Sequence, residues 1–178
     1  MELELISAAI PDYARDLRLN LASVLTVTGA PGLSEEQIWS IALAAALAAR
    51  NAAFARQIEA LAATRLSVQH VQAAHSAAAI MGMNNVYYRF VHLVADPEYQ
   101  QLPARLRMNV IGNPGVGKVD FELMSLAVSA INACGMCISA HERALRQQGV
   151  AREPIHSAVR IAATVHAVAG VLEYRQAA

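Results

Sequence analysis

The feature that most constrains the fold is the predominance of good helix formers over any pattern that would form strands. Ala, Leu, Glu, Gln and Arg dominate, and β-branched or aromatic residues rarely alternate with polar ones over more than a few positions. Of the 178 residues, 56% are apolar, a composition that excludes disorder and lets a chain of this length bury a core without structural crosslinks. The sequence therefore predicts an all-α fold, a single compact domain over residues 1–178 with about seven to eight helices.

Helix start signals divide the first half of the chain. The segment Ser34–Gln37 is a capping box and opens a helix that we expect to end at Asn51. A short Ala-rich helix should follow. Ser67 can then cap a long helix, which Asp96-Pro97 stops because the residue before a proline is disfavoured in the α conformation.

The second half should contain loops at residues 95–104 and 112–117, with a short helical segment between them. A helical pattern then runs over Phe121–Gln148, with Asp120 as its expected N-cap and Gly149 as its C′ residue. Pro154 occupies the first turn of a last helix that reaches Tyr174. No linker separates these parts.

The charge balance and the N-terminal region exclude several partners and locations. The 14 basic and 14 acidic residues cancel, which leaves no basic face for nucleic acid or for an anionic membrane surface. The longest strictly apolar run near the N-terminus, Ile41–Ala49, is well short of the roughly 18 residues that span a bilayer. The start, Met1–Glu4, is acidic where a secretory signal would be basic. We therefore expect a cytoplasmic protein that binds neither nucleic acid nor a membrane.

The residues that can carry chemistry lie between Glu122 and His141. The chain has two cysteines, Cys134 and Cys137, whose spacing in a reducing compartment indicates redox chemistry or a metal site. Both thiols and His141 can share one face of a helix. On a continuous straight helix, however, Glu122 would lie about 18 Å from Cys134, too far to act with it.

We therefore expect a bend at Asn132–Gly135, since Asn and Gly are poor interior helix residues and Asn or Cys can cap a new helix. The bend would place Glu122 beside His141. Both thiols would then lie at the start of the second helix, where free N–H groups and the helix dipole favour a thiolate. His141 could take a thiol proton and Glu122 could orient the imidazole, which makes a proton relay next to a pair of thiols.

Two other interpretations remain open from the residues alone. The cysteines could be small buried residues of the core. A zinc ion could bind Cys134, Cys137 and His141, although a structural zinc site normally has four ligands and no fourth Cys or His lies nearby. The other histidines show no partnering pattern and are expected to be structural: His70, His75, His92, His156 and His166.

The order Glu122, eleven residues, Cys134-x-x-Cys137, three residues and His141 resembles the redox signature of the alkylhydroperoxidase AhpD family, in the carboxymuconolactone decarboxylase-like superfamily. The likeness covers most of the chain and includes residues 9–14 together with 19–21, residues 79–89 and residues 106–109.

This resemblance implies a homotrimer that reduces organic hydroperoxides and an AhpC-type peroxiredoxin. Its electrons would come from dihydrolipoamide carried by a lipoyl-bearing 2-oxo-acid dehydrogenase component, and we expect no bound metal, haem or flavin. The resemblance implies that Cys137 is the thiolate that attacks peroxide and that Cys134 resolves the resulting sulfenic acid to a disulfide. It also implies that Glu122 and His141 move the protons. Some relatives carry a histidine directly before the second cysteine, where this chain has Met136.

The sequence thus predicts a lipoyl-dependent alkyl hydroperoxide reductase with a Cys134–Cys137 dithiol/disulfide cycle. One alternative is a protein disulfide reductase with little peroxidase activity. The other is a non-enzymatic metal-binding or assembly module.

Overall fold

The computed structural model describes residues 2–176, and within that part of the chain it contains helices and no strand. The elements in chain order are α1 (Glu2–Ala9), the 3-10 helix η1 (Asp12–Ala14), α2 (Arg15–Val24), α3 (Glu35–Ala48), α4 (Ala52–Ala63), α5 (Val68–Val94), α6 (Pro97–Gln101), α7 (Asn109–Gly112), α8 (Lys118–Ile131), α9 (Gly135–Gln147) and α10 (Arg152–Gln176). Eight of these α-helices have eight or more residues, which confirms the all-α prediction and the expected number of substantial helices.

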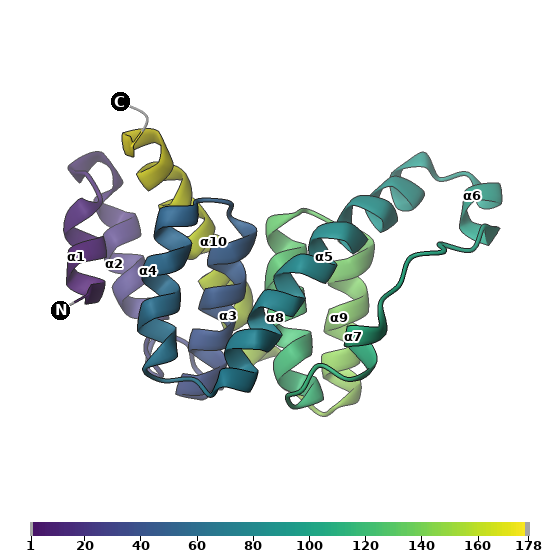
Figure 1. The fold of residues 1–178 in the computed structure, drawn as a ribbon, viewed down its shortest axis with the longest axis horizontal. Coiled ribbons are helices and arrows are strands. Elements are labelled where there is room, and N and C mark those ends of the chain that lie inside the picture. Colours follow the sequence, from purple (N-terminus) through teal and green to yellow (C-terminus); the bar gives the residue numbers. More distant parts are fainter. Residues whose placement is uncertain (1, 177–178) are drawn as a thin grey trace.

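The core forms around α3 and α8, which are apolar on nearly every side. Residues 38–46 of α3 and residues 121–129 of α8 are buried without interruption. A helix of this kind must be surrounded by others. The two helices pack against each other and against α5 and α10 (Figure 1). The many alanines in α3 allow these helices to approach closely.

Two of the predicted helix caps are confirmed. Ser34 Oγ accepts a hydrogen bond from the backbone N–H of Gln37, and the Gln37 side chain accepts one from the Ser34 N–H. Ser67 caps α5 in the same way by accepting from the N–H of His70. Asn51, in contrast, does not end α3. It is the N-cap of α4, where its Oδ1 accepts from the Phe54 N–H.

The predicted cap at Asp120 is wrong. Helix α8 begins at Lys118, with Gly117 in the N-cap position, so Asp120 lies inside the first turn. There its carboxylate accepts a 2.8 Å hydrogen bond from Gln37 Nε2 and connects α8 to α3. A carboxylate is favourable both as an N-cap and within the first turn, so the local pattern does not distinguish the two positions.

Among the described residues, one helix, α10 over Arg152–Tyr174, is long and apolar enough to cross a bilayer, by length and composition only. In the most apolar 18-residue stretch of this helix, 56% is buried inside the protein, where α10 packs on α2, α3 and α8. The apolar run Ile41–Ala49 lies in α3 and at its C-cap. A core helix such as α10 can be long and apolar enough to span a bilayer because one of its faces packs inside the protein.

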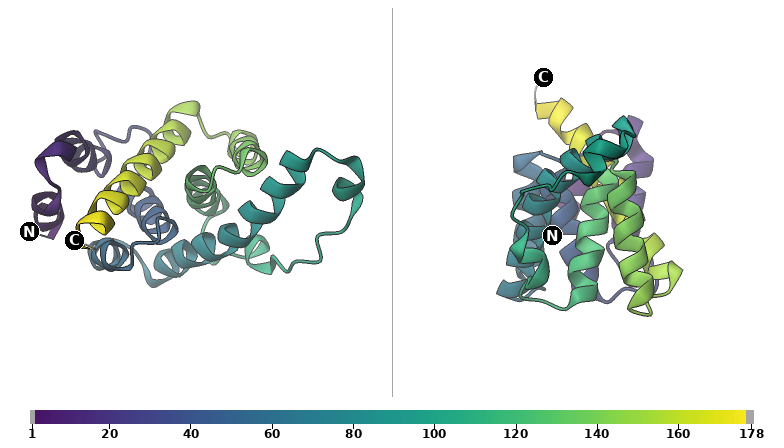
Figure 2. Two further views of the ribbon diagram at one scale, coloured as in Figure 1. Left: turned by 90° about the horizontal axis from the view of Figure 1, so that it is seen from above. Right: turned by 90° about the vertical axis from the view of Figure 1, so that its right-hand side faces the viewer.

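The end of α5 and all of α6 form an arm that projects from the helical body (Figures 1 and 2). The helix α6 falls in a segment expected to be a loop, and Asp96 caps it through the Glu98 N–H. Several apolar side chains of the arm are exposed by 42–71%: Phe90, Leu93, Val94, Tyr99 and Leu102. The rings of Phe90 and Tyr99 pack edge to face on each other, which joins α5 to α6 within the arm. Both side chains nevertheless stay partly exposed to solvent.

Candidate active site

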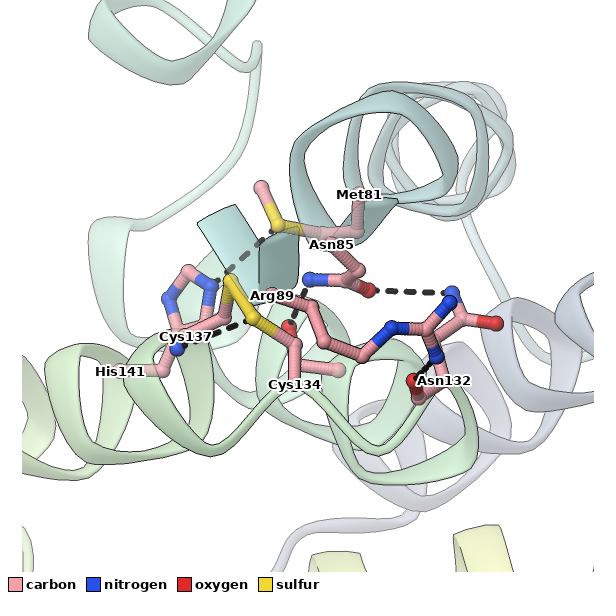
Figure 3. Close-up of a disulfide and its surroundings, with 8 residues drawn as sticks. Met81, Asn85, Arg89, Asn132, Cys134, Cys137 and His141 are labelled. Atoms are coloured by element: carbon pink, nitrogen blue, oxygen red, sulfur yellow. Dashed lines mark hydrogen bonds between the residues drawn. A yellow bond between two sulfur atoms is a disulfide. The ribbon is translucent and has the colours of Figure 1, made fainter. Parts of the chain in front are cut away.

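The predicted bend is present between α8 and α9. Helix α8 ends at Ile131 and α9 begins at Gly135, with Cys134 as its N-cap. The sulfur of Cys134 accepts a hydrogen bond from the Cys137 N–H, and the two cysteines form a disulfide (Figure 3). Ala133 adopts a left-handed conformation with φ of 53°, which costs a non-glycine residue roughly 1–2 kcal/mol. The rest of the structure must hold this turn in place.

A polar network from α5 holds the turn. Asn132 Nδ2 donates to Asn85 Oδ1 at 3.0 Å, and Asn85 Nδ2 donates to Ser129 Oγ at 2.9 Å (Figure 3). Arg89 Nη1 donates to the backbone carbonyl of Asn132 at 2.7 Å. The sequence did not predict this network. Two consecutive asparagines in the interior of a long helix, where asparagine is disfavoured, were the available signal.

Glu122 and His141 meet as predicted, across the bend. The distance between His141 Nδ1 and Glu122 Oε2 is 2.7 Å, and the two side chains are only 14% and 11% exposed. An ionised carboxylate accepts hydrogen bonds, so the Nδ1–H donates to Glu122. The other ring nitrogen, Nε2, lies 3.3 Å from the sulfur of Met81 (Figure 3). The carboxylate therefore fixes the orientation of the imidazole and leaves Nε2 for other chemistry.

A cavity of about 260 Å³ opens beside the disulfide. Its walls combine apolar and polar side chains: Met81, Met108, Ile111, Met136 and Ala140 with Asn84, Tyr88, Cys137 and His141. Cys137 lines this cavity, whereas Cys134 is fully buried and does not. A small molecule in the cavity would thus meet Cys137 and His141 together.

The cavity also shows which functional positions the sequence did not predict. Met81, Asn84 and Tyr88 come from α5, and their spacing of three and four residues places them on one face of that helix. Met136, between the two cysteines, supplies part of the apolar wall.

Two of the histidines that showed no partnering pattern in the sequence pair with carboxylates of other helices. His75 Nε2 lies 3.0 Å from Glu59, and His70 Nδ1 lies 3.2 Å from Glu36. These carboxylates are on α4 and α3, so the pairs arise from helix packing and have no local sequence signal. Among residues 2–176, no group of three or more His, Cys, Asp or Glu side chains is placed to hold a metal ion.

The fold and the site define a class of protein: an all-helical protein in which a Cys-x-x-Cys pair begins a helix beside a buried His–Glu pair. In agreement with this, the model of the carboxymuconolactone decarboxylase family matches residues 97–178, which include both cysteines and His141.

Similarity to characterised families extends over nearly the whole chain. The alkyl hydroperoxide reductase AhpD of Rhodospirillum centenum is 58% identical over 173 residues, which cover 97% of this chain and 91% of that protein. AhpD of Hyphomonas neptunium is 58% identical over 97% of this chain and 94% of its own length. AhpD of Streptomyces avermitilis is 54% identical, with coverages of 97% and 96%. This chain belongs to the alkyl hydroperoxide reductase AhpD family.

Proposed function

We propose that this protein is an antioxidant thiol peroxidase that reduces alkyl hydroperoxides through a Cys134–Cys137 dithiol/disulfide cycle. The observation that carries the proposal is that Cys137 and His141 line one cavity, Cys137 in a disulfide with the buried Cys134 and His141 paired with Glu122. The names of the relatives, alkyl hydroperoxide reductases, support the same substrate class. The apolar wall of the cavity suits the alkyl group of such a substrate.

The proposed cycle begins with dithiol protein. His141 takes the proton of the Cys137 thiol, and the thiolate attacks the terminal oxygen of the hydroperoxide. An S–O bond forms as the O–O bond breaks, and the departing alkoxide takes the proton from His141. The sulfenic acid on Cys137 then condenses with the thiol of Cys134 to give the disulfide and water. Two thiols and one hydroperoxide yield one disulfide, one alcohol and one water.

The helix start explains why these positions suit the chemistry. Cys134 is the N-cap of α9 and Cys137 lies in its first turn, where the free N–H groups and the positive end of the dipole favour a thiolate. Glu122 stabilises the protonated His141 that forms when the thiol is deprotonated.

The disulfide needs a reductant to complete the cycle. We propose dihydrolipoamide, borne by a lipoyl component of a 2-oxo-acid dehydrogenase, which becomes lipoamide as it restores both thiols. An AhpC-type peroxiredoxin would be a second oxidant, reduced by the same dithiol. The name of the relatives, alkyl hydroperoxide reductase AhpD, supports the peroxiredoxin partner. The lipoyl donor and a cytoplasmic location are parts of the same proposal.

We propose that the protein assembles as a homotrimer through the arm of α5 and α6. The arm projects from the helical body (Figure 2). Its exposed apolar side chains, among them Leu93 and Leu102, support this proposal. Leu93 is 71% exposed, so Leu93→Glu should dissociate the trimer and leave the fold intact. Light scattering after size exclusion measures the mass; an unchanged mass for this variant, or a monomeric wild type, would contradict the proposal.

The catalytic proposal is tested with reduced protein and stoichiometric cumene hydroperoxide. We expect both thiols to be lost and one equivalent of alcohol to form, followed by continuous turnover when dihydrolipoamide is supplied. The same assay with an AhpC-type peroxiredoxin, alone and with peroxide, measures the second reaction. Fast reduction of the peroxiredoxin without peroxide consumption would instead indicate a protein disulfide reductase. Bound zinc with protected thiols would indicate a metal-binding module.

A further inference from the structure

The imidazole of His141 has a side-chain contact at each of its two nitrogens. Nδ1 lies 2.7 Å from Glu122 Oε2, and Nε2 lies 3.3 Å from the sulfur of Met81 (Figure 3). Met81 belongs to α5 and is only 1% exposed, so a ring carried by α9 is held by side chains from α8 and α5. The proposed cycle gives a role to the contact with Glu122 and none to the contact with Met81.

The contact with Met81 is a hydrogen bond in one protonation state of the ring. Because Nδ1–H donates to Glu122, Nε2 of the neutral imidazole carries a lone pair and has no hydrogen to donate. A thioether sulfur has none either. When His141 is protonated, Nε2–H can donate to the sulfur, which is a weak acceptor. The Met81 sulfur therefore stabilises the imidazolium and gives no comparable support to the neutral ring.

The other titratable groups at the ring and its cavity come from three helices. Glu122 on α8 contacts the ring, Cys137 on α9 lines the same cavity, and Tyr88 lines it from α5. The residues that line the cavity from α7 and its N-cap carry no charge. With Cys137 in the disulfide, no thiol there titrates, so the influence of Met81 on the ring can be measured separately from that of a thiolate.

We propose that Met81 is a positioning residue for His141: its thioether accepts the Nε2–H hydrogen bond of the imidazolium and so favours and aligns the charged ring. The part of this inference that concerns peroxide rests on the proposed function. In that cycle Nε2 takes the proton of the Cys137 thiol and later gives it to the departing alkoxide. A weak acceptor suits both steps, because it supports the charged ring and still releases the proton. A carboxylate in the same place would hold that proton more strongly.

The first test uses the disulfide form. Met81→Leu removes the acceptor with little change in volume, a kind of substitution that protein cores tolerate. Met83→Leu is the matched control, since it makes the same change on α5 at a half-buried residue that does not line the cavity. Nitrogen-15 NMR of histidine-labelled protein follows the titration of His141, whose signals are identified by their loss in His141→Gln.

We expect Met81→Leu to move the midpoint of the His141 titration to lower pH by about 0.5 unit or more, because only the charged ring loses a hydrogen bond. Met83→Leu should leave the midpoint where it is in wild type. A residue that only packs against the ring would not move the titration.

The second test measures the reaction with peroxide. Stopped-flow kinetics of the reduced proteins with cumene hydroperoxide give the second-order rate constant across pH. Half a pH unit corresponds to about a threefold change in the protonated fraction of the ring on the alkaline side of its titration. We therefore expect Met81→Leu to lower the rate constant about threefold or more on that side of the profile, and Met83→Leu to match wild type.

The two tests separate this inference from the proposed function. An unchanged His141 midpoint in Met81→Leu overturns the role of Met81. A shifted midpoint with an unchanged peroxide rate also overturns it, since the contact would then not act in the reaction. A wild type that does not consume peroxide contradicts the proposed function, and the NMR titration still decides whether Met81 stabilises the charged ring. If circular dichroism shows that Met81→Leu does not fold, Met81→Ile, which also lacks the acceptor, is measured against the same expectations.

Discussion

Two histidine–glutamate pairs in this molecule have similar nitrogen–oxygen distances, through Nδ1 of His141 and Nε2 of His75, and very different surroundings. His141 and Glu122 approach to 2.7 Å, and His75 and Glu59 approach to 3.0 Å. The side chains of the first pair are 14% and 11% exposed, those of the second 46% and 37%. The first pair spans the bend between α8 and α9, and its His141 lines the same cavity as Cys137. The second joins α5 to α4 at the surface.

The comparison shows that location gives such a pair its chemistry. Water and salt screen the exposed pair, and such pairs are worth about 0–1 kcal/mol. Near the thiols, the surrounding protein excludes most water, so the Glu122 carboxylate acts on His141 with less screening. In the proposed cycle, the thiol of Cys137, which lines the same cavity as His141, supplies the proton that the imidazole takes. Substitutions in the two pairs and in their surroundings test this contrast.

The largest effect is expected from removing the thiol that the buried pair serves. Cys137→Ser should abolish peroxide reduction, because a hydroxyl has a far higher pKa than a thiol and is a poor nucleophile toward peroxide. Cys134→Ser should instead allow one turnover and leave a sulfenic acid on Cys137. Trapping with a sulfenic-acid reagent and mass spectrometry locates the modified residue. A sulfenic acid on Cys134 in wild type would reverse the assignment of the two thiols.

The next largest effect should come from the carboxylate of the buried pair. Glu122→Gln keeps the shape but removes the charge that supports protonated His141, and general acid–base help is typically worth about 10²–10⁴ in rate. We expect peroxide reduction to fall about tenfold or more, with both thiols still titratable. Unchanged kinetics would show that contact between Glu122 and His141 does not contribute to the reaction.

The network behind the bend should matter for stability. Asn85→Ala leaves the buried Ser129 hydroxyl and the half-buried Asn132 amide without their partner, and one unpaired buried polar group costs about 1–3 kcal/mol. We expect the free energy of unfolding in urea to fall by about 1–3 kcal/mol. Asn113→Ala, at an exposed loop position, is the control. Equal stabilities would mean that the network does not hold the left-handed turn at Ala133.

The smallest effect is expected at the exposed pair. Glu59→Gln and His75→Gln should each change the free energy of unfolding by no more than about 0.5 kcal/mol and leave the peroxidase rate within about twofold of wild type. The same urea and stopped-flow measurements apply. A rate loss comparable to that of Glu122→Gln would remove the distinction between the two pairs.

The local features of this protein follow from its sequence. The caps at Ser34 and Ser67, the αL residue Gly149 after α9 and the bend near Asn132 were all predicted and are present. Each depends on residues within a turn or two of the feature, where backbone preferences and side-chain caps dominate. The meeting of Glu122 with His141 also follows, because a bend midway between them leaves few other ways for the two helices to pack.

Other features depend on helices that meet only in the folded chain. Asn85 contacts Ser129 across 44 positions, and Met81 contacts His141 across 60. The side-chain spacing on α5 shows which residues share a face, but it does not show which helix that face will meet. The cavity, the network behind the bend and the partners of His70 and His75 arise from such meetings. Helix packing decides them, because burial and hydrogen bonding act between whichever surfaces the fold brings together, whatever their separation along the chain.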